Sequence, residues 1–240
     1  MELEDAIILA GGKGTRLRPL TFEVPKPLIK INGKPLIEYA VEELERNGIK
    51  NIYLSLGYKS NKIIDYFNKR HKFGARIEFI IESKPLGTGG AIRYAMSKMQ
   101  RYEDVAVVYA DTVYRFDLKQ MHTLHKARNA LVTIGTVEME DIRGFGVLET
   151  ADSKVVNFVE KPDPKSVQSR TVSAGVYILS KIVEEKLPKS EAFSFEKDFL
   201  SKACKEENIL HFPIERFITV NNIEQYKIAK NMLKFAGGEI

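Results

Sequence analysis

Apolar and amphipathic stretches alternate through the first half of the chain. Short runs of consecutive apolar residues, such as Ala6–Ala10, are typical of strands buried on both faces. Longer stretches place apolar side chains on one helical face, as Ile37 and Leu44 do in Pro35–Asn47, and Gly48 stands where such a helix would end. Strands separated by helices in this way predict a parallel sheet covered by helices on both faces, the doubly wound α/β arrangement.

The same reading predicts elements along the whole chain. The expected strands are Ala6–Ala10, Asn51–Leu56, Arg76–Ile81, Asp104–Ala110, Ala130–Val137, Gly146–Glu149, Val155–Glu160, Thr171–Leu179, Ile209–Phe212 and Phe217–Val220. The expected helices are Pro35–Asn47, Lys62–Lys69, Gly89–Met99, Leu118–Arg128, Lys181–Lys186, Ser194–Lys205 and Ile223–Phe235, the last ended by Gly237-Gly238. Short polar turns separate the later strands, so antiparallel additions are expected there. We therefore expect one domain over residues 1–240, with a single Rossmann-like, mostly parallel sheet.

Composition narrows the class of protein. A chain of 240 residues that is 44% hydrophobic and 29% charged is typical of a folded globular domain. No apolar run approaches the roughly 20 residues of a membrane span, and the acidic start Met1–Asp5 is unlike a signal peptide. One cysteine, Cys204, and four scattered histidines exclude a disulfide framework and disfavour a zinc site. We expect a cytoplasmic protein that binds no membrane.

Charge disfavours nucleic acid as a partner. The net charge is +5, but the basic residues are spread along the chain without a long run of like charge. A mildly basic balance suits phosphorylated small molecules equally well. Small-molecule substrates are therefore the expected partners.

Leu9–Leu28 predicts a phosphate-binding loop. It follows the first strand directly, and ligands bind at the carboxyl edge of open α/β sheets. Its glycines leave backbone N–H groups free to face an anion, and its cations add positive charge. These residues are Gly11, Gly12, Gly14, Lys13, Arg16, Arg18 and Lys26.

Two familiar phosphate motifs are excluded. A Walker A loop needs Ser or Thr after its lysine, whereas Gly14 follows Lys13 and Pro35 follows Lys34. A dinucleotide fingerprint needs glycine where Leu17 stands, and an acidic residue at the end of the second strand. The sequence therefore disfavours a nicotinamide cofactor.

Asp111 is a candidate metal ligand. It follows the apolar strand that ends at Ala110, beside the expected phosphate loop. A carboxylate in that place suits a hard divalent cation, with Mg²⁺ the expected one. The alternative is a turn or helix-capping aspartate.

The pattern GGKGTRLRPLT followed by PKPL resembles the sugar-1-phosphate nucleotidyltransferases, also called NDP-sugar pyrophosphorylases. The resemblance continues through Pro85–Gly90, Asp111, Gly146, Val159–Pro162 and Ala174-Gly175. Ser194–Phe199 is most similar to the subgroup that activates mannose or heptose 1-phosphates with GTP. The resemblance implies a glycosyltransferase-A-like fold and a Mg²⁺-dependent transfer of nucleoside monophosphate from NTP to a sugar 1-phosphate, with release of pyrophosphate.

The resemblance also implies roles for individual residues. Arg16 and Lys26 would be catalytic, Arg16 on the departing pyrophosphate and Lys26 on the α-phosphate. The acceptor would be held by Gly146, Glu160 and Lys161. The nucleotide would be bound by Leu9, Ala10, Gly11, Gly12, Lys13, Gly14, Thr15, Leu86, Gly87 and Thr88.

The chain departs from its relatives at the second metal ligand. Most of them place an Asp before the final helix, where simple alignment here gives Thr219. Val220–Asn222 instead resembles the N-acetylglucosamine-1-phosphate uridylyltransferases, in which an Asn fills that place, so Asn221 is the expected ligand beside Asp111. The alternative is that Asn221 and Asn222 only turn the chain and cap the last helix.

Other departures leave the substrate open. Tyr109-Ala110 stands where relatives often have Asn-Gly, and Ser173 where they commonly have Asn. One alternative is a nucleotide-sugar-binding regulator with weakened turnover, and another is a UTP- or dTTP-dependent glucose-1-phosphate enzyme. No hexapeptide-repeat tail is visible, so a monomer or homodimer is expected instead of the trimer that such a domain forms.

Overall fold

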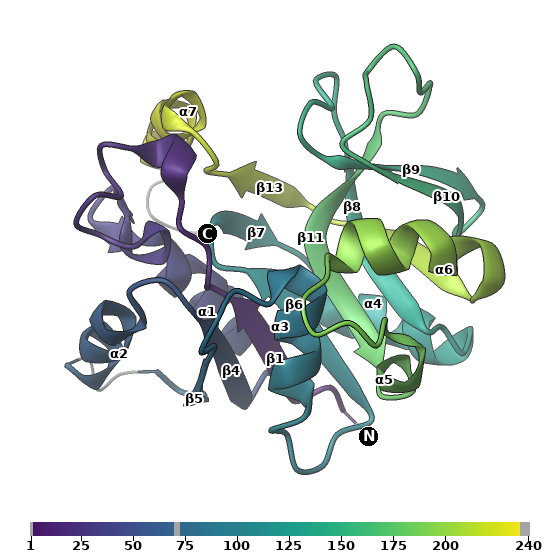
Figure 1. The fold of residues 1–240 in the computed structure, drawn as a ribbon. Helices are drawn as coiled ribbons and strands as arrows, with labels where there is room; N and C mark the ends of the chain where they lie inside the picture. The colour runs from purple at the N-terminus through teal and green to yellow at the C-terminus, as the bar shows by residue number, and fades with distance from the viewer. Residues whose placement is uncertain (1, 70–72, 236–240) are drawn as a thin grey trace.

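A mixed nine-stranded sheet forms the centre of the computed structural model, which describes residues 2–69 and 73–235 (Figure 1). In spatial order its strands are β5 (Arg76–Ile81), β4 (Asn51–Leu56), β1 (Asp5–Leu9), β6 (Asp104–Tyr109), β11 (Thr171–Ser180), β8 (Val132–Glu138), β12 (Ile209–Pro213), β10 (Lys154–Glu160) and β9 (Gly146–Ala151). Two small ribbons pair β7 (Thr112–Arg115) with β13 (Arg216–Thr219) and β2 (Lys30–Ile31) with β3 (Lys34–Pro35).

Strand directions change between the two halves of the sheet. Strands β5, β4, β1 and β6 run parallel, whereas β11 runs antiparallel to both of its neighbours, β6 and β8. The α/β class and the antiparallel additions are thus confirmed, but the sheet as a whole is mixed rather than mostly parallel. The physical reason is that the short turn between β9 and β10 permits only an antiparallel pair, and that β11 returns between β6 and β8 in the opposite direction.

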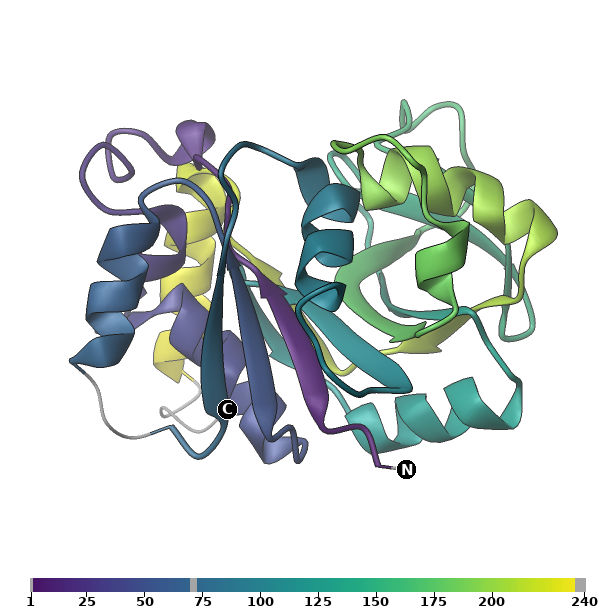
Figure 2. The same cartoon turned by 60° about the horizontal axis from the view of Figure 1, so that its bottom comes forward.

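Helices cover both faces of the sheet (Figure 2). Their bounds are α1 (Leu36–Arg46), α2 (Ser60–Asn68), α3 (Gly87–Met96), α4 (Leu118–Ala127), α5 (Val183–Lys186), a π-helix (Phe195–Leu200), α6 (Ser201–Glu206) and α7 (Ile223–Phe235). In β1, Ile7 packs in the core with α3 and α6, and Ile8 packs in the core with α1, α2 and α4. Both faces of β1 are therefore buried, as its continuous apolar run predicts.

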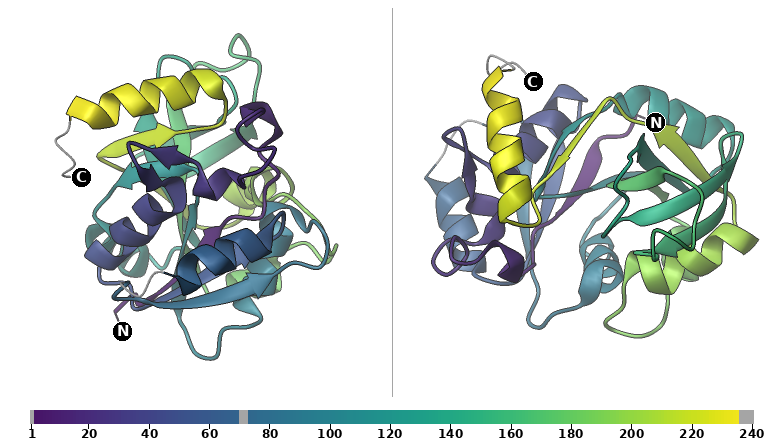
Figure 3. Two further views of the ribbon diagram at one scale, coloured as in Figure 1. Left: turned by 90° about the vertical axis from the view of Figure 1, so that its left-hand side faces the viewer. Right: turned by 90° about the horizontal axis from the view of Figure 1, so that it is seen from above.

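A third apolar cluster fixes the loop that follows β1. Leu17, in a 3₁₀ turn at Thr15–Leu17, is fully buried against residues of β7, β13 and α7, including Val113 and Leu233. Figure 3 shows α7 crossing above this part of the chain. The last helix thereby holds the phosphate loop in place from outside the sheet.

The predicted elements match the structure in order, but one helix is of another type, and the short strands β2, β3 and β7 were not predicted. The expected helix Ser194–Lys205 is a π-helix continued by α6, and β7 was not predicted because four residues carry too little periodicity. Gly237-Gly238, expected to end α7, lies outside the described residues. Among the residues that the structure describes, no helix combines the length and apolar character that crossing a membrane requires.

Candidate functional site

A pocket of about 930 Å³ lies at the carboxyl ends of β1, β4 and β6. It is lined by Arg16, Lys26, Asp111 and Asn221 and by every residue predicted to bind the nucleotide. Those nucleotide residues are Leu9, Ala10, Gly11, Gly12, Lys13, Gly14, Thr15, Leu86, Gly87 and Thr88. The structure therefore gathers the predicted nucleotide, catalytic and metal residues in one place.

Gly14 fixes the shape of the phosphate loop. Its φ of 60° lies in the left-handed region, and a Cβ there would lie 2.8 Å from the Cβ of Lys26. The hydroxyl of Thr21 donates to the Gly14 carbonyl at 2.9 Å, and the Tyr58 N–H donates to the Gly11 carbonyl at 3.1 Å. The loop is thus held on both sides, and only glycine fits at position 14.

Lys26 lies between the two predicted metal ligands. Its side chain is nearly buried, and its Nζ donates to Asp111 Oδ2 and, at 2.8 Å, to Asn221 Oδ1. The Val220 N–H donates to the Asp111 carbonyl at 3.0 Å, which fixes the two segments side by side. Two side-chain oxygens distant in sequence therefore converge on the Lys26 ammonium group, and oxygen is the ligand that a hard divalent cation prefers.

Further ligands for such a cation would come from substrate or water. Within residues 2–69 and 73–235, no three His, Cys, Asp or Glu side chains are grouped so that they could hold a metal ion. Mg²⁺ commonly takes one or two protein oxygens and completes its shell with phosphate and water. Asp111 and Asn221 are compatible with this mode of coordination.

The two asparagines after β13 have different partners. Asn221 donates through Nδ2 to Thr219 Oγ1 at 2.9 Å, which leaves its Oδ1 on Lys26. Asn222 Oδ1 accepts from the Gln225 N–H at 2.8 Å, a capping contact in the first turn of α7. The capping alternative therefore applies to Asn222, whereas Asn221 turns toward Asp111.

The predicted acceptor residues lie outside the lining of this pocket. Gly146 pairs with Glu160 across the β9–β10 ladder, and Lys161 Nζ contacts Glu160 Oε1 at 2.6 Å. Burial raises the pKa of Glu160, and the adjacent Lys161 opposes that rise. A Cβ at Gly146 would lie 2.3 Å from the ring of Phe158, so the structure gives this glycine a packing role beside the proposed contact with sugar.

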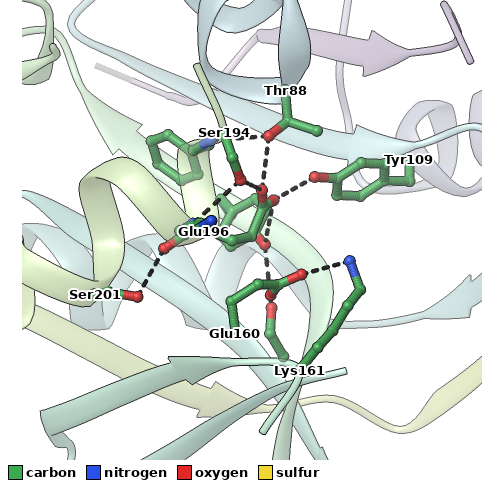
Figure 4. A network of polar contacts seen from close by, with 11 residues as sticks. Thr88, Tyr109, Glu160, Lys161, Ser194, Glu196 and Ser201 are labelled. Carbon is green, nitrogen blue, oxygen red and sulfur yellow. Dashed lines mark hydrogen bonds and ion pairs between the residues drawn. The ribbon is translucent and has the colours of Figure 1, made fainter. Parts of the chain in front are cut away.

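Several pocket residues escaped prediction from sequence. They are Pro27, Gly57, Tyr58, Glu82, Ser83, Lys84, Pro85, Ala91, Tyr109 and Ala110. Gly57 and Glu82 follow the carboxyl ends of β4 and β5, so their position after strands was the available signal. Glu196, beside the pocket, was also missed (Figure 4). Its sequence signal was its place in Ser194–Phe199, the segment similar to the mannose and heptose subgroup, which gave Glu196 no role of its own.

The fold and this pocket define a class of protein. A glycine-rich loop after the first strand, a lysine, and a carboxylate and an amide that converge at the carboxyl edge of an α/β sheet are groups suited to phosphorylated substrates and a divalent cation. Residues 5–217 match the nucleotidyl transferase family, and the chain belongs to that family. The resemblance drawn from the sequence is confirmed.

The most similar relatives include guanylyltransferases that act on sugar 1-phosphates. The chain is 37% identical over 231 residues to D-glycero-alpha-D-manno-heptose 1-phosphate guanylyltransferase of Aneurinibacillus thermoaerophilus, covering 96% of this chain and 98% of the relative. It is 35% identical over 197 residues to mannose-1-phosphate guanylyltransferase of Mycobacterium tuberculosis, covering 81% of this chain but 54% of that relative. The chain thus spans about half the length of some curated relatives.

Solved structures agree with the fold. The crystal structure of HddC from Yersinia pseudotuberculosis complexed with GMP-PN superposes with a TM-score of 0.80 at 36% identity, covering 96% of this chain and all of that one. A UDP-glucose pyrophosphorylase complexed with UDP-glucose gives a TM-score of 0.84 at 24% identity over 98% of this chain and all of that one. The second likeness concerns the fold alone.

Proposed function

We propose that this chain transfers a nucleoside monophosphate from an NTP to a sugar 1-phosphate, giving an NDP-sugar and pyrophosphate. GTP with a mannose- or heptose-type sugar phosphate is the proposed pair, supported by the guanylyltransferases that the chain resembles. The observation that carries the proposal is Lys26 held between Asp111 and Asn221 inside the glycine-loop pocket. It joins a phosphate loop, a cation and a metal donor pair in one place.

The proposed reaction requires the protein to position the two substrates, and it does not require a general base. A phosphate oxygen of the sugar 1-phosphate attacks the α-phosphorus, and the bond from that phosphorus to the oxygen bridging the α- and β-phosphates breaks, so that pyrophosphate leaves. The attacking phosphate carries about −1.5 to −2 charge near neutral pH and is already a nucleophile. The protein must hold two anions in line and offset the charge that develops.

In the proposed mechanism, Lys26 and Arg16 supply the positive charge that offsets the developing negative charge. Lys26 would contact the α-phosphate, and the prolines on either side of it limit its backbone freedom. Arg16, in the 3₁₀ turn of the loop, would offset charge on the departing pyrophosphate. A Mg²⁺ ion held by Asp111 and Asn221 would supply Lewis-acid charge at the phosphates when bound.

Glu160 and Lys161 would hold the acceptor. The Lys161 side chain is 59% exposed and remains free to meet a phosphate from solvent. Glu160 is largely buried beside it and would accept hydrogen bonds from sugar hydroxyls. The strand end that carries both residues is fixed, because the Lys161 N–H donates to the Phe145 carbonyl at 3.0 Å.

Pyrophosphate release tests the proposal against its alternatives. Each of GTP, ATP, UTP, CTP and dTTP is supplied with Mg²⁺ and with mannose, heptose or glucose 1-phosphate in turn. Release with GTP and a mannose- or heptose-type phosphate is the expected result. Release with UTP or dTTP and glucose 1-phosphate would favour the second substrate pair, and nucleotide binding without release would favour the regulator. Cytoplasmic location and a monomeric or homodimeric state stay predictions.

A further inference from the structure

Glu196 is a nearly buried carboxylate beside the pocket, on the π-helix Phe195–Leu200. Four hydroxyl groups donate to it (Figure 4). Thr88 and Ser194 donate to Oε2 at 2.6 and 3.0 Å. Tyr109 and, at 3.3 Å, Tyr177 donate to Oε1. The donors come from different elements, so one side chain joins α3, β6, β11 and its own helix.

This arrangement uses the whole acceptor capacity of Glu196. An ionised carboxylate offers about four lone-pair sites, and each oxygen here already accepts two hydrogen bonds. Burial and the negative charge of Glu196 raise the pKa of Tyr109 and of Tyr177 well above the usual range, so both phenols remain donors near neutral pH. Glu196 therefore has no oxygen left for a metal ion or a substrate proton.

One side of the network fixes the start of α3, where Leu86, Gly87 and Thr88 line the pocket; we call these three residues the nucleotide wall. Thr88 Oγ1 also accepts from the Phe195 N–H at 2.8 Å, and the Gly89 N–H donates to the Phe193 carbonyl at 3.0 Å. Gly87 has a φ of 70°, and a Cβ there would lie 2.5 Å from the same carbonyl oxygen. The start of α3, which lines the pocket, is thus docked closely onto the segment that carries Glu196.

The other side of the network reaches β11, and Figure 4 shows Glu160 and Lys161 beside it, Glu160 near enough to act on the Tyr177 hydroxyl through its charge. Tyr109 ends β6 two residues before Asp111, and its ring lies against Gly175, where a Cβ would be 2.6 Å from Cδ2. Tyr177 shares a hydrogen bond of 3.2 Å with Ser173 on β11. Tyr109 also lines the pocket, so this one side chain faces both the pocket and Gly175 of β11 in the second half of the sheet.

We propose that Glu196 is a positioning residue that couples the nucleotide wall, through Thr88, to the acceptor side, through Tyr109. The inference rests on the proposed function and deepens it. Glu196 acts by holding hydroxyl groups in place and does not touch the reacting atoms. Removing it would therefore disturb both substrates, whereas removing either hydroxyl alone would disturb mainly one.

A double-mutant cycle tests this coupling. Glu196→Gln keeps one acceptor oxygen and replaces the other with a donor, so kcat/KM should fall about tenfold for both substrates. Tyr109→Phe should raise KM mainly for the sugar phosphate, and Thr88→Val mainly for the nucleotide. Adding Tyr109→Phe to Glu196→Gln should cost little more than Glu196→Gln alone. Multiplicative effects of the two substitutions would overturn the proposal.

Asp198→Ala is the matched structural control. Asp198 Oδ2 accepts from the Ser194 N–H at 2.8 Å, so this variant weakens the start of the same helix without removing a hydroxyl partner of Glu196. It should lower the melting temperature and leave both KM values near those of the wild type. If Asp198→Ala reproduced the kinetic pattern of Glu196→Gln, a merely structural role would be shown and the proposal overturned.

Calorimetry with a non-hydrolysable GTP analogue separates this proposal from the proposed function. Wild-type binding without turnover on any sugar phosphate would count against the proposed function. The Thr88→Val and Glu196→Gln cycle could still be read in the dissociation constants. Coupled losses there would support the network, and independent losses would overturn it.

Discussion

The nucleotide side and the acceptor side of this site are built in different ways. On the nucleotide side, the loop after β1 is continuous in sequence, and all its predicted residues except the exposed Arg18 line one pocket. On the acceptor side, Gly146, Glu160 and Lys161 come from the β9–β10 hairpin and from the residue that follows it, and none of them lines that pocket. The first side is a pocket lined by glycines and cations, which we propose binds the phosphates, and the second is a surface with an exposed lysine.

This difference in burial predicts that Lys26 stabilises the transition state, whereas Lys161 contributes to binding of the acceptor. Lys26 is almost buried and held by two partners, so its charge acts at low dielectric and is already in position. Lys161 has one partner, Glu160, and its side chain is 59% exposed, so water screens it. Substitutions on the nucleotide side should therefore affect the rate, and those on the acceptor side should affect affinity.

The largest effect is expected for Lys26→Ala. Loss of one preorganised contact to transition-state charge costs on the order of 100-fold or more in rate, so kcat should fall by that amount while nucleotide binding changes little. Steady-state kinetics and calorimetry with a GTP analogue measure the two quantities. Lys30→Ala, an exposed lysine four residues later, should behave like the wild type. A normal kcat with weakened GTP binding would make Lys26 a ground-state anchor.

Asn221→Ala should give the next largest effect, and it should depend on metal. Loss of an oxygen ligand should cost about 10- to 100-fold in apparent Mg²⁺ affinity, as even outer-shell substitutions do, and excess metal should restore much of the activity. Mn²⁺ binding followed by electron paramagnetic resonance provides a readout that does not depend on turnover.

Asn222→Ala is the matched comparison. It removes the cap of α7 and should lower stability by about 1 kcal/mol without changing metal affinity. Equal Mn²⁺ affinity in Asn221→Ala and the wild type would leave Asp111 as the sole protein ligand.

Lys161→Ala should have a smaller effect, confined to the acceptor. Because the Lys161 side chain is exposed, its removal should raise KM for the sugar phosphate about fivefold and leave KM for the nucleotide unchanged. Initial rates with each substrate varied in turn measure this. The exposed Lys165 serves as the control for loss of surface charge. If KM rose equally for the nucleotide and the sugar phosphate, the assignment of Lys161 to the acceptor alone would be contradicted.

The smallest effect is expected at the opposite end of β6, where Asp104 is structural. Its carboxyl group is 2.8 Å from His122 Nε2 and 3.3 Å from Lys126 Nζ. Burial alone would raise the pKa of Asp104, but the hydrogen bond with His122 and the nearby His125 and Lys126 side chains outweigh it and hold that pKa below the usual range. Its contribution to stability is therefore present above the unfolded pKa, about 3.9, and is lost as pH falls through the folded value.

Asp104→Asn should lower the free energy of unfolding by about 1–3 kcal/mol at pH 7, with kinetic constants unchanged. Urea unfolding should show the difference shrinking below about pH 4, because the Asp104 carboxyl group is then protonated in the unfolded wild-type chain while it stays ionised in the folded one. Glu103→Gln, on an exposed neighbour, should show no such trend. A difference that stays constant down to pH 3 would contradict the assignment.

Sequence reasoning was most informative where chemistry is local. The loop from Leu9 to Thr15 could be predicted because its glycines and cations are adjacent, and strand periodicity placed it at the sheet edge. The Asp111–Asn221 pair needed a resemblance to relatives, since only the β7–β13 ribbon brings the two residues together. Glu196 was missed because its partners lie on α3, β6 and β11, and no local pattern records such a contact.

Antiparallel pairing was expected for the strand that became β11, but its place between β6 and β8 was not predicted, for the same reason. Its apolar run is compatible with either direction, and only tertiary pairing places it between β6 and β8. Gly175 illustrates the limit: its φ of 70° and its contact with the Tyr109 ring arise from a register shift in β11 that sequence spacing does not reveal.

Transfer of label from α-³²P-GTP tests the central claim most directly. Incubation with Mg²⁺ and mannose or heptose 1-phosphate should move the α-label into a nucleotide-sugar, with one pyrophosphate released for each product and no transfer without the sugar phosphate. The Lys26→Ala enzyme should show almost none of this transfer. Label that remains in GTP with every sugar phosphate, or release of orthophosphate in place of pyrophosphate, would contradict the account.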